Sequence, residues 1–141
     1  MNSKPMEEVK DKIRSMDFKE SFDLIVAIAN GGIIPATMLS NFLQVKLELL
    51  KINYRDINQR PIYESPQLLT EIDFDITGKT ILLVEDRVKT GATLQYAKQL
   101  LSGAALVKTF AVNGPADYFL YDEACFSFPW NMGIKQPVAK V

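Results

Sequence analysis

Two adjacent carboxylates precede a glycine-containing loop in the stretch "ILLVEDRVKTGATL" at residues 81–94. Glu85 and Asp86 directly follow an apolar run, so a strand over that run would present both acids at its carboxyl end. Carboxylate oxygens accept hydrogen bonds from neighbouring hydroxyl groups, as on a ribose, and they also hold hard cations such as Mg²⁺. The acid pair therefore predicts a site for a sugar or for magnesium.

The loop after the acids is typical of an anion site. Lys89 leads into Thr-Gly-Ala-Thr at residues 90–93, and the residues beyond have helical spacing. Unpaired N–H groups and the dipole at a helix N-terminus attract phosphate, Thr90 and Thr93 add hydroxyl donors, and Gly91 permits a close backbone approach. Carboxylates beside amides indicate a ribose 5-phosphate site. The alternative is a simple turn in which the two acids cap the helix and stay solvated.

A second loop follows another apolar run. "DLIVAIA" at residues 23–29 ends in Asn30, Gly31 and Gly32, and the segment after them has helical spacing. A glycine pair after a strand is by itself more often a tight turn, but beside a phosphate loop it favours a ligand contact.

Strands and helices alternate along the chain in a way that places both loops at one edge. Buried apolar strands separated by helices predict an α/β fold with a parallel twisted sheet and helices on both faces. Ligands bind such sheets at the carboxyl ends of the strands. Pro5 stands at the first position of the first helix, and Gly103 caps the last. The predicted elements are helix 6–16, strand 23–29, helix 33–43, strand 45–52, a long loop 53–66, strand 80–85, helix 93–103, strand 105–112 and short strands in the aromatic tail.

Composition narrows the class of protein. The chain has 141 residues, which suggests one domain, a net charge of −1, one cysteine and no histidine. The charge gives no reason to expect nucleic acid or an anionic membrane surface, and no apolar run approaches the ~20 residues that span a bilayer. The absence of histidine excludes Ser-His and Cys-His nucleophile pairs. With one cysteine, Cys125, and no secretory signal pattern, the expected location is the cytoplasm.

The two loops together resemble a known family, the type I phosphoribosyltransferases. Residues 81–94 resemble its motif for phosphoribosyl pyrophosphate (PRPP), and "IVAIANGGIIPATML" at residues 25–39 resembles its pyrophosphate loop. "NYRDINQRP" and "FPWNMGI" are similar to the mobile loop and the C-terminal stretch of the xanthine-guanine phosphoribosyltransferases in particular. The matches run from about residue 23 to residue 134 of the chain.

The resemblance implies a type I phosphoribosyltransferase fold over residues 1–141, with a small C-terminal hood mainly at residues 110–134. It implies transfer of 5-phosphoribose from PRPP to a nucleobase, with Mg²⁺ as cofactor and pyrophosphate as product. It assigns catalysis to Glu85, Asp86 and Lys89, and the metal to Glu85 and Asp86. The implied PRPP-binding residues are Asn30, Gly31, Gly32, Glu85, Asp86, Arg87, Val88, Lys89, Thr90, Gly91, Ala92 and Thr93. The implied mobile-loop contacts are Tyr54, Arg55 and Arg60, and the base contacts are Val112, Cys125 and Phe126.

Four residues depart from the family pattern. Lys89 stands where purine enzymes carry an aspartate that is a candidate general base, and Asn30 replaces a basic residue at the pyrophosphate. Val112 replaces a lysine that contacts the base, and Cys125 replaces a stacking aromatic residue. Positive charge at Arg87 and Lys89 would either offset the charge missing at Asn30 or favour an acidic, carbonyl-rich base.

These departures leave two functions open. One is an active phosphoribosyltransferase with an altered base preference, acting on PRPP and a small base, with a homodimer or tetramer as the expected assembly. The other is a non-catalytic module that binds PRPP or a nucleotide and has a degenerate base site. A third, an interaction protein with a vestigial site, conflicts with the intact acid pair and Thr-Gly-Ala-Thr loop.

Overall fold

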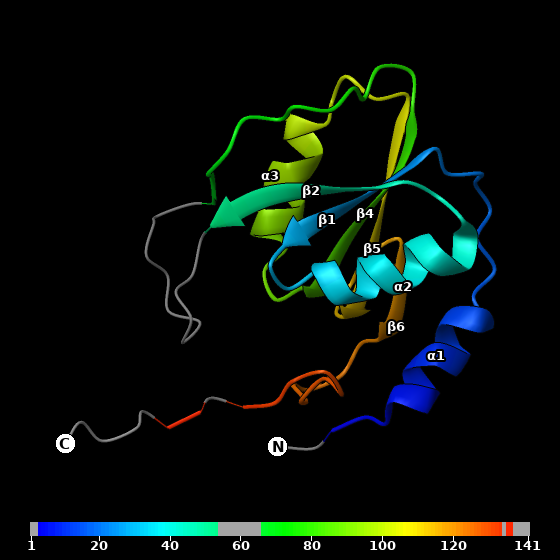
Figure 1. The fold of residues 1–141 in the computed structure, drawn as a ribbon, viewed down its shortest axis with the longest axis vertical. Helices are drawn as coiled ribbons and strands as arrows, with labels where there is room; N and C mark the ends of the chain where they lie inside the picture. The colour runs from blue at the N-terminus through cyan, green and yellow to red at the C-terminus, as the bar shows by residue number, and fades with distance from the viewer. Residues whose placement is uncertain (1–2, 54–65, 134, 137–141) are drawn as a thin grey trace.

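A six-stranded sheet organises the protein, as seen in a computed structural model that describes residues 3–53, 66–133 and 135–136 (Figure 1). The strand order is β3-β2-β1-β4-β5-β6, and every neighbouring pair is parallel except β2 with β3. The strands are β1 (Leu24–Ala29), β2 (Leu47–Asn53), β3 (Gln67–Leu68), β4 (Thr80–Arg87), β5 (Leu106–Asn113) and β6 (Tyr118–Tyr121). The helices are α1 (Met6–Arg14), α2 (Ile33–Leu43) and α3 (Ala92–Leu100). The predicted α/β class is confirmed.

Strand β1 is apolar along its whole length because both faces of the sheet are covered. Alternate side chains of a strand point to opposite faces. Ile25 and Ala27 of β1 accordingly pack in the core beneath α1 and α2, whereas Val26 and Ile28 pack in the core beneath α3. This arrangement explains why "LIVAIA" lacks the alternation of a half-exposed strand.

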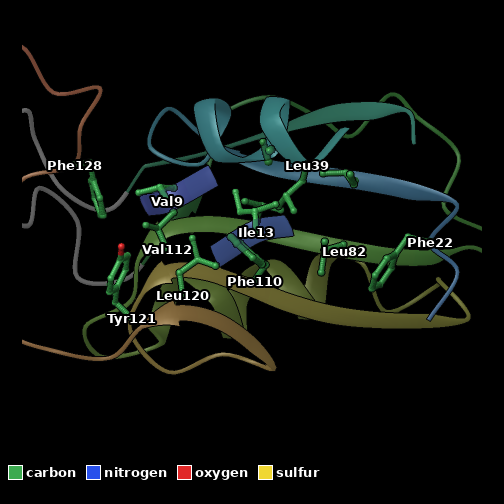
Figure 2. Packing of buried hydrophobic residues seen from close by; sticks show 14 of the residues in the cluster. Val9, Ile13, Phe22, Leu39, Leu82, Phe110, Val112, Leu120, Tyr121 and Phe128 are labelled. Atoms are coloured by element: carbon green, nitrogen blue, oxygen red, sulfur yellow. The ribbon is translucent and has the colours of Figure 1, made fainter. Parts of the chain in front are cut away.

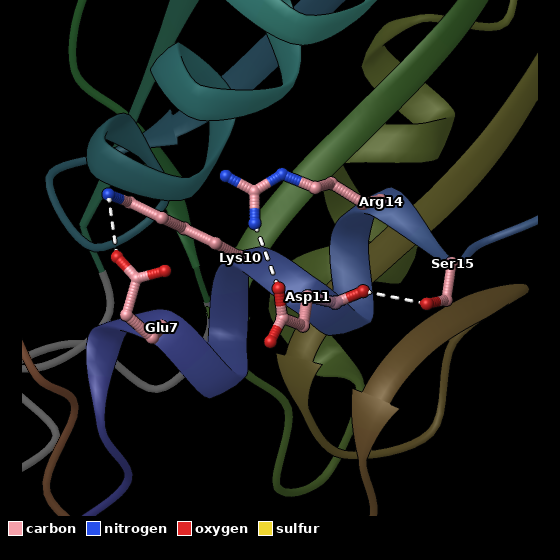
Figure 3. Close-up of polar contacts among 5 residues, drawn as sticks. All are labelled: Glu7, Lys10, Asp11, Arg14 and Ser15. Carbon is pink, nitrogen blue, oxygen red and sulfur yellow. Dashed lines mark hydrogen bonds and ion pairs between the residues drawn. The ribbon is translucent and has the colours of Figure 1, made fainter.

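Helix α1 covers one end of the sheet with an amphipathic face. Val9 and Ile13, four residues apart, are buried in the core shown in Figure 2. Pro5 is the N-cap residue rather than the first helical residue, and the helix ends at Arg14, two residues earlier than the spacing predicts. On the exposed side, ion pairs join Glu7 to Lys10 and Asp11 to Arg14 (Figure 3).

Other parts of the fold also differ from the sequence prediction. Strand β4 continues two residues beyond Glu85, because pairing with β5 extends to Arg87 opposite Asn113. Helix α3 is capped by Leu101 and not by Gly103. Residues 110–121 of the predicted hood mostly belong to the main sheet, because β6 pairs in parallel with β5. In the part of the chain that the structure describes, no helix has the length and apolar character to cross a membrane.

Candidate functional site

The two predicted loops meet because β1 and β4 are adjacent, parallel strands in the middle of the sheet. The chain runs outward in opposite directions from this pair, to β2 on one side and to β5 on the other. Such a switch point leaves a crevice at the carboxyl ends of the strands, where ligands of open α/β sheets bind. The loop of residues 30–32 and the acid pair therefore share one edge.

Gly31 marks the place where the two loops touch. A Cβ atom built on Gly31 would lie 2.6 Å from Oδ2 of Asp86, so only a residue without a side chain fits there with the carboxylate in place. A Cβ atom on Gly32 would lie 2.3 Å from the carbonyl oxygen of Val84. Asn30, at the start of this loop, is exposed, and the peptide bond between Ala29 and Asn30 is cis. The pyrophosphate loop expected from the sequence thus lies directly against the acid pair.

Glu85 and Asp86 form a tight carboxylate pair. The Asp86 amide donates to Oε1 of Glu85 at 3.0 Å, and the Arg87 amide donates to Oδ1 of Asp86 at 2.6 Å. Burial, reinforced by the negative charge of Asp86, raises the pKa of Glu85 well above its ordinary value. No ion pair is found for either carboxylate within the described residues. Neither acid therefore has a cationic partner among the described residues, so a bound cation would stabilise the charged form of the pair.

Magnesium fits this donor set. Among the described residues no cluster of three or more acidic, cysteine or histidine side chains could hold a metal by itself. Mg²⁺ commonly uses only one or two protein carboxylates and takes its other ligands from water and substrate phosphates. Glu85 and Asp86 supply such an incomplete set.

The loop between β4 and α3 has the form of an anion nest. Gly91, the N-cap residue of α3, has φ +83°, a conformation that favours glycine. The Ala92 amide donates to Oγ1 of Thr90 at 3.2 Å. Within the described chain, the amides of Thr90, Gly91 and Thr93 have no protein acceptor. Free amides at a helix N-terminus are the group that binds phosphate.

Glu85→Gln is expected to remove a pH-dependent loss of stability from the metal-free protein. Because the folded state raises the pKa of Glu85, the cost of its charge is absent below its ordinary value of 4.5 and is complete above the raised value. The stability of the variant relative to wild type should therefore increase as the pH rises from about 4.5 to neutrality. Urea unfolding in EDTA at several pH values measures this difference, and a difference independent of pH would contradict the prediction.

The side chain of Arg87, a predicted PRPP contact, binds the C-terminal tail in this structure. Its Nη2 donates to the carbonyl oxygen of Phe126 at 2.6 Å, and its guanidinium lies 4.6 Å from the ring centre of Phe128. Lys89 and Thr90, in contrast, are exposed on the loop. Only the backbone of Arg87 remains beside Asp86.

The predicted base contacts have different environments. Val112 is fully buried in the core beneath α1 and α2, and Phe126 packs between Tyr121 and Phe128, so neither side chain is open to a ligand in this structure. Both are buried because β5 lies inside the sheet and the tail folds its aromatic side chains inward. Cys125 is exposed. The predicted loop contacts Tyr54, Arg55 and Arg60 lie outside the described residues.

Asn113 lies at the same edge of the sheet as the acid pair and was not predicted from the sequence as a candidate residue. It is buried at the end of β5, opposite Arg87, and its side chain both donates to the Glu123 carbonyl and accepts from the Glu123 amide, each at 3.1 Å. Its own carbonyl accepts from the Val88 amide at 2.9 Å. An asparagine directly after an apolar strand was the available signal.

An open cavity of about 700 Å³ lies elsewhere, between α1 and β6. Met16, Phe119 and Leu120 supply much of its apolar lining. No lining residue belongs to the loops at residues 30–32 and 85–93, so this cavity is separate from the predicted site.

Comparison with known proteins shows which family the sequence matches. The phosphoribosyl transferase domain family matches residues 6–127. The xanthine-guanine phosphoribosyltransferase of Chromohalobacter salexigens is 33% identical over 124 residues, covering 82% of this chain and 73% of that protein. The pyrimidine operon regulatory protein of Lactococcus lactis subsp. lactis is 36% identical over 77 residues, covering 52% of this chain and 44% of that protein.

Among solved structures, a purine phosphoribosyltransferase from Pyrococcus horikoshii superposes with a TM-score of 0.76. The match covers 98% of this chain and 97% of that one at 24% sequence identity. At this identity the superposition supports the shared fold.

Proposed function

Because this chain belongs to the phosphoribosyl transferase domain family, we propose that it transfers 5-phosphoribose from PRPP to a nucleobase-like acceptor and releases pyrophosphate. The observation that carries the proposal is the contact between Gly31 and the Asp86 carboxylate, which joins the two loops at one sheet edge. A single ligand with a pyrophosphate at one carbon of its ribose and a phosphate at another would touch both loops at once.

The acid pair and the loop of residues 89–93 bind different parts of PRPP. Glu85 and Asp86 accept hydrogen bonds from the ribose hydroxyls, and the amides and hydroxyls of residues 89–93 hold the 5-phosphate. Asn30, Gly31 and Gly32 contact the pyrophosphate through their backbone. The transition state resembles an oxocarbenium ion, so the protein acts by positioning the reactants and stabilising charge.

Mg²⁺ is the proposed cofactor, held by Glu85 and Asp86. When bound with PRPP it would neutralise negative charge on the departing pyrophosphate. The lack of an ion pair to either carboxylate within the described residues supports this assignment.

We attribute a preference among acceptor bases to Lys89. Its ammonium group is exposed on the loop that follows the acid pair, at a position where related purine enzymes hold a carboxylate. A cation there cannot accept a proton from the base, and it favours a carbonyl-rich or anionic ring. We therefore expect dioxo bases such as xanthine to be better acceptors than hypoxanthine.

A second function is a regulatory module that binds PRPP or a nucleotide without transfer. The neutral Asn30 and the missing carboxylate at Lys89 favour it, as does the match to a pyrimidine operon regulatory protein over 52% of the chain. The first function is preferred, because the longer match at 82% of the chain is to a phosphoribosyltransferase. For either function, we propose a cytoplasmic protein that forms a dimer or tetramer.

Thermal unfolding with PRPP, Mg²⁺ and a panel of nucleotides is the first test. We expect PRPP with Mg²⁺ to raise the melting temperature more than either alone. No stabilisation by any of these ligands would contradict both functions.

Pyrophosphate release with a panel of bases then separates the enzyme from the regulator. Release with at least one base supports transfer, whereas PRPP binding without release for every base supports the regulatory module. Lys89→Ala should reduce the preference for dioxo bases, and an unchanged affinity for PRPP and for every base would remove Lys89 from the site.

A further inference from the structure

The tail of the protein is anchored to the strand ends that carry the site. We call residues 123–130 the C-terminal segment. Asn113 holds its first residue, Glu123, by two hydrogen bonds, and Arg87 holds the carbonyl oxygen of Phe126. Arg87 and Asn113 are paired residues of β4 and β5, so two neighbouring strands bind the segment through adjacent residues.

Arg87 touches the acid pair and the C-terminal segment at the same time. Its amide donates to Oδ1 of Asp86 at 2.6 Å, while its Nη2 donates to Phe126 at 2.6 Å. Its guanidinium lies 4.6 Å from the ring centre of Phe128, which stacks on Trp130 at 5.2 Å with an interplanar angle of 12°. A chain of direct contacts therefore leads from the Asp86 carboxylate to the indole ring.

The segment does not depend on Arg87 for its attachment as a whole. Lys4 forms an ion pair with Glu123 at 2.6 Å, and Ser3 forms a backbone bridge with Ser127. Phe126 is packed edge-on against Tyr121 and Phe128. Loss of the Arg87 side chain should therefore shift the part of the segment nearest the site without unfolding it.

The Nε–H group of Arg87 is a second indication that this arginine has a role beyond packing. It is buried, and within the described residues it has no hydrogen-bond acceptor. A buried donor without a partner is costly, and an uncharged side chain would avoid that cost. A planar guanidinium, by contrast, can hold a carbonyl oxygen and stack on a ring at once, which lysine cannot do.

We propose that Arg87 is a positioning residue that couples occupation of the acid pair to the placement of the C-terminal segment, and that this coupling sets the affinity for the acceptor base. The inference rests on the proposed function, in which Asp86 contacts the ribose of PRPP, and it takes the segment, through its exposed residue Cys125, to border the base. Binding at Asp86 orders the Arg87 backbone, and the side chain carries that order to Phe126 and Phe128. By linkage, a bound base strengthens PRPP binding by the same factor.

Trp130 makes the coupling visible, because it is the only tryptophan in the chain. Addition of PRPP with Mg²⁺ to the wild-type protein should change its fluorescence. In Arg87→Met the response should be lost. The KM for base should rise about tenfold to a hundredfold, the effect of losing a hydrogen bond from a charged group. The Kd for PRPP, measured without base, should stay within about threefold, because the backbone contact to Asp86 remains.

Arg87→Lys and Arg14→Met complete the experiment. Lysine keeps the charge but not the planar stack, so it should restore part of the base affinity and little of the fluorescence response. It also serves as the test variant if Arg87→Met does not fold. Arg14 is exposed on α1 and pairs only with Asp11 within the described part of the chain, so its substitution should leave every readout unchanged.

Two results would overturn the coupling and leave the proposed function intact. One is a wild-type protein that PRPP stabilises without any change in Trp130 fluorescence. The other is a variant whose KM for base is unchanged, or whose Kd for PRPP rises as much as its KM for base. If PRPP does not stabilise the wild-type protein at all, the proposed function fails and the coupling fails with it.

Discussion

Asp86→Asn is expected to lower kcat/KM for PRPP by about 100-fold or more and to leave the fold intact. Asparagine keeps an oxygen that can accept the hydrogen bond from the Arg87 amide, so the local backbone is preserved. It removes the charge that lies against Gly31 and beside Glu85, which is the charge that we assign to the ribose and to Mg²⁺. Steady-state pyrophosphate release at varied PRPP and Mg²⁺ concentrations measures the loss.

Asp75→Asn is the matched control. Asp75 accepts a hydrogen bond from the amide of Thr77 at 2.9 Å, in a turn before β4, so the same chemical change is made in a similar local setting. Its activity should stay within about twofold of wild type, because surface changes away from a site have small effects. An Asp86→Asn protein with full activity, or one whose loss is matched by Asp75→Asn, would show that the acid pair has no special role.

Gly32→Ala is expected to destabilise the protein by about 3 kcal/mol, a large effect for the addition of one methyl group. The added Cβ atom would lie 2.3 Å from the carbonyl oxygen of Val84 and 2.8 Å from that of Ile28. Both are backbone atoms of the central strands, so neither can rotate away, and the crossing from β1 to α2 must shift. Urea unfolding with tryptophan fluorescence and circular dichroism measures the change.

Gly103 and Gly31 are the controls for Gly32→Ala. At Gly103 a Cβ atom would make only ordinary contact, 3.6 Å from Cδ1 of Ile76, so Gly103→Ala should change stability by less than about 1 kcal/mol. At Gly31 the clash is with the rotatable Asp86 side chain, so alanine should reduce activity more than stability. Equal stability of the Gly32 and Gly103 variants would contradict the close packing of the loop against Val84.

Local patterns predicted the elements that form the site. Helix α2 begins and ends where its spacing indicates, and β1 differs from its prediction by one residue, because a continuous apolar run followed by two glycines has few other solutions. The acids at residues 85–86 and the Thr-Gly-Ala-Thr loop after them were identified by residue type and spacing. The family assignment made from these motifs is confirmed.

Residues whose role depends on a distant partner were not predicted in the same way. Val112 and Phe126 were expected at the base, but the packing of β5 and of the aromatic tail buries both side chains. Arg87 was expected at PRPP, but the carbonyl of Phe126, 39 residues away, holds its guanidinium. Asn113 was missed because its partner Glu123 lies across a turn in the tail.

There is a physical reason why some features were predictable from the sequence and others were not. Side-chain periodicity and turn chemistry are local, so the sequence alone was sufficient to predict the strands and helices that carry the acid pair, the Thr-Gly-Ala-Thr loop and the glycine loop. That Gly31 lies against Asp86, far along the chain, follows from the pairing of β1 with β4, and that pairing is chosen by the packing of both cores. The direction of the Arg87 side chain was decided in the same way, because only the folded tail brings an acceptor and an aromatic ring within its reach.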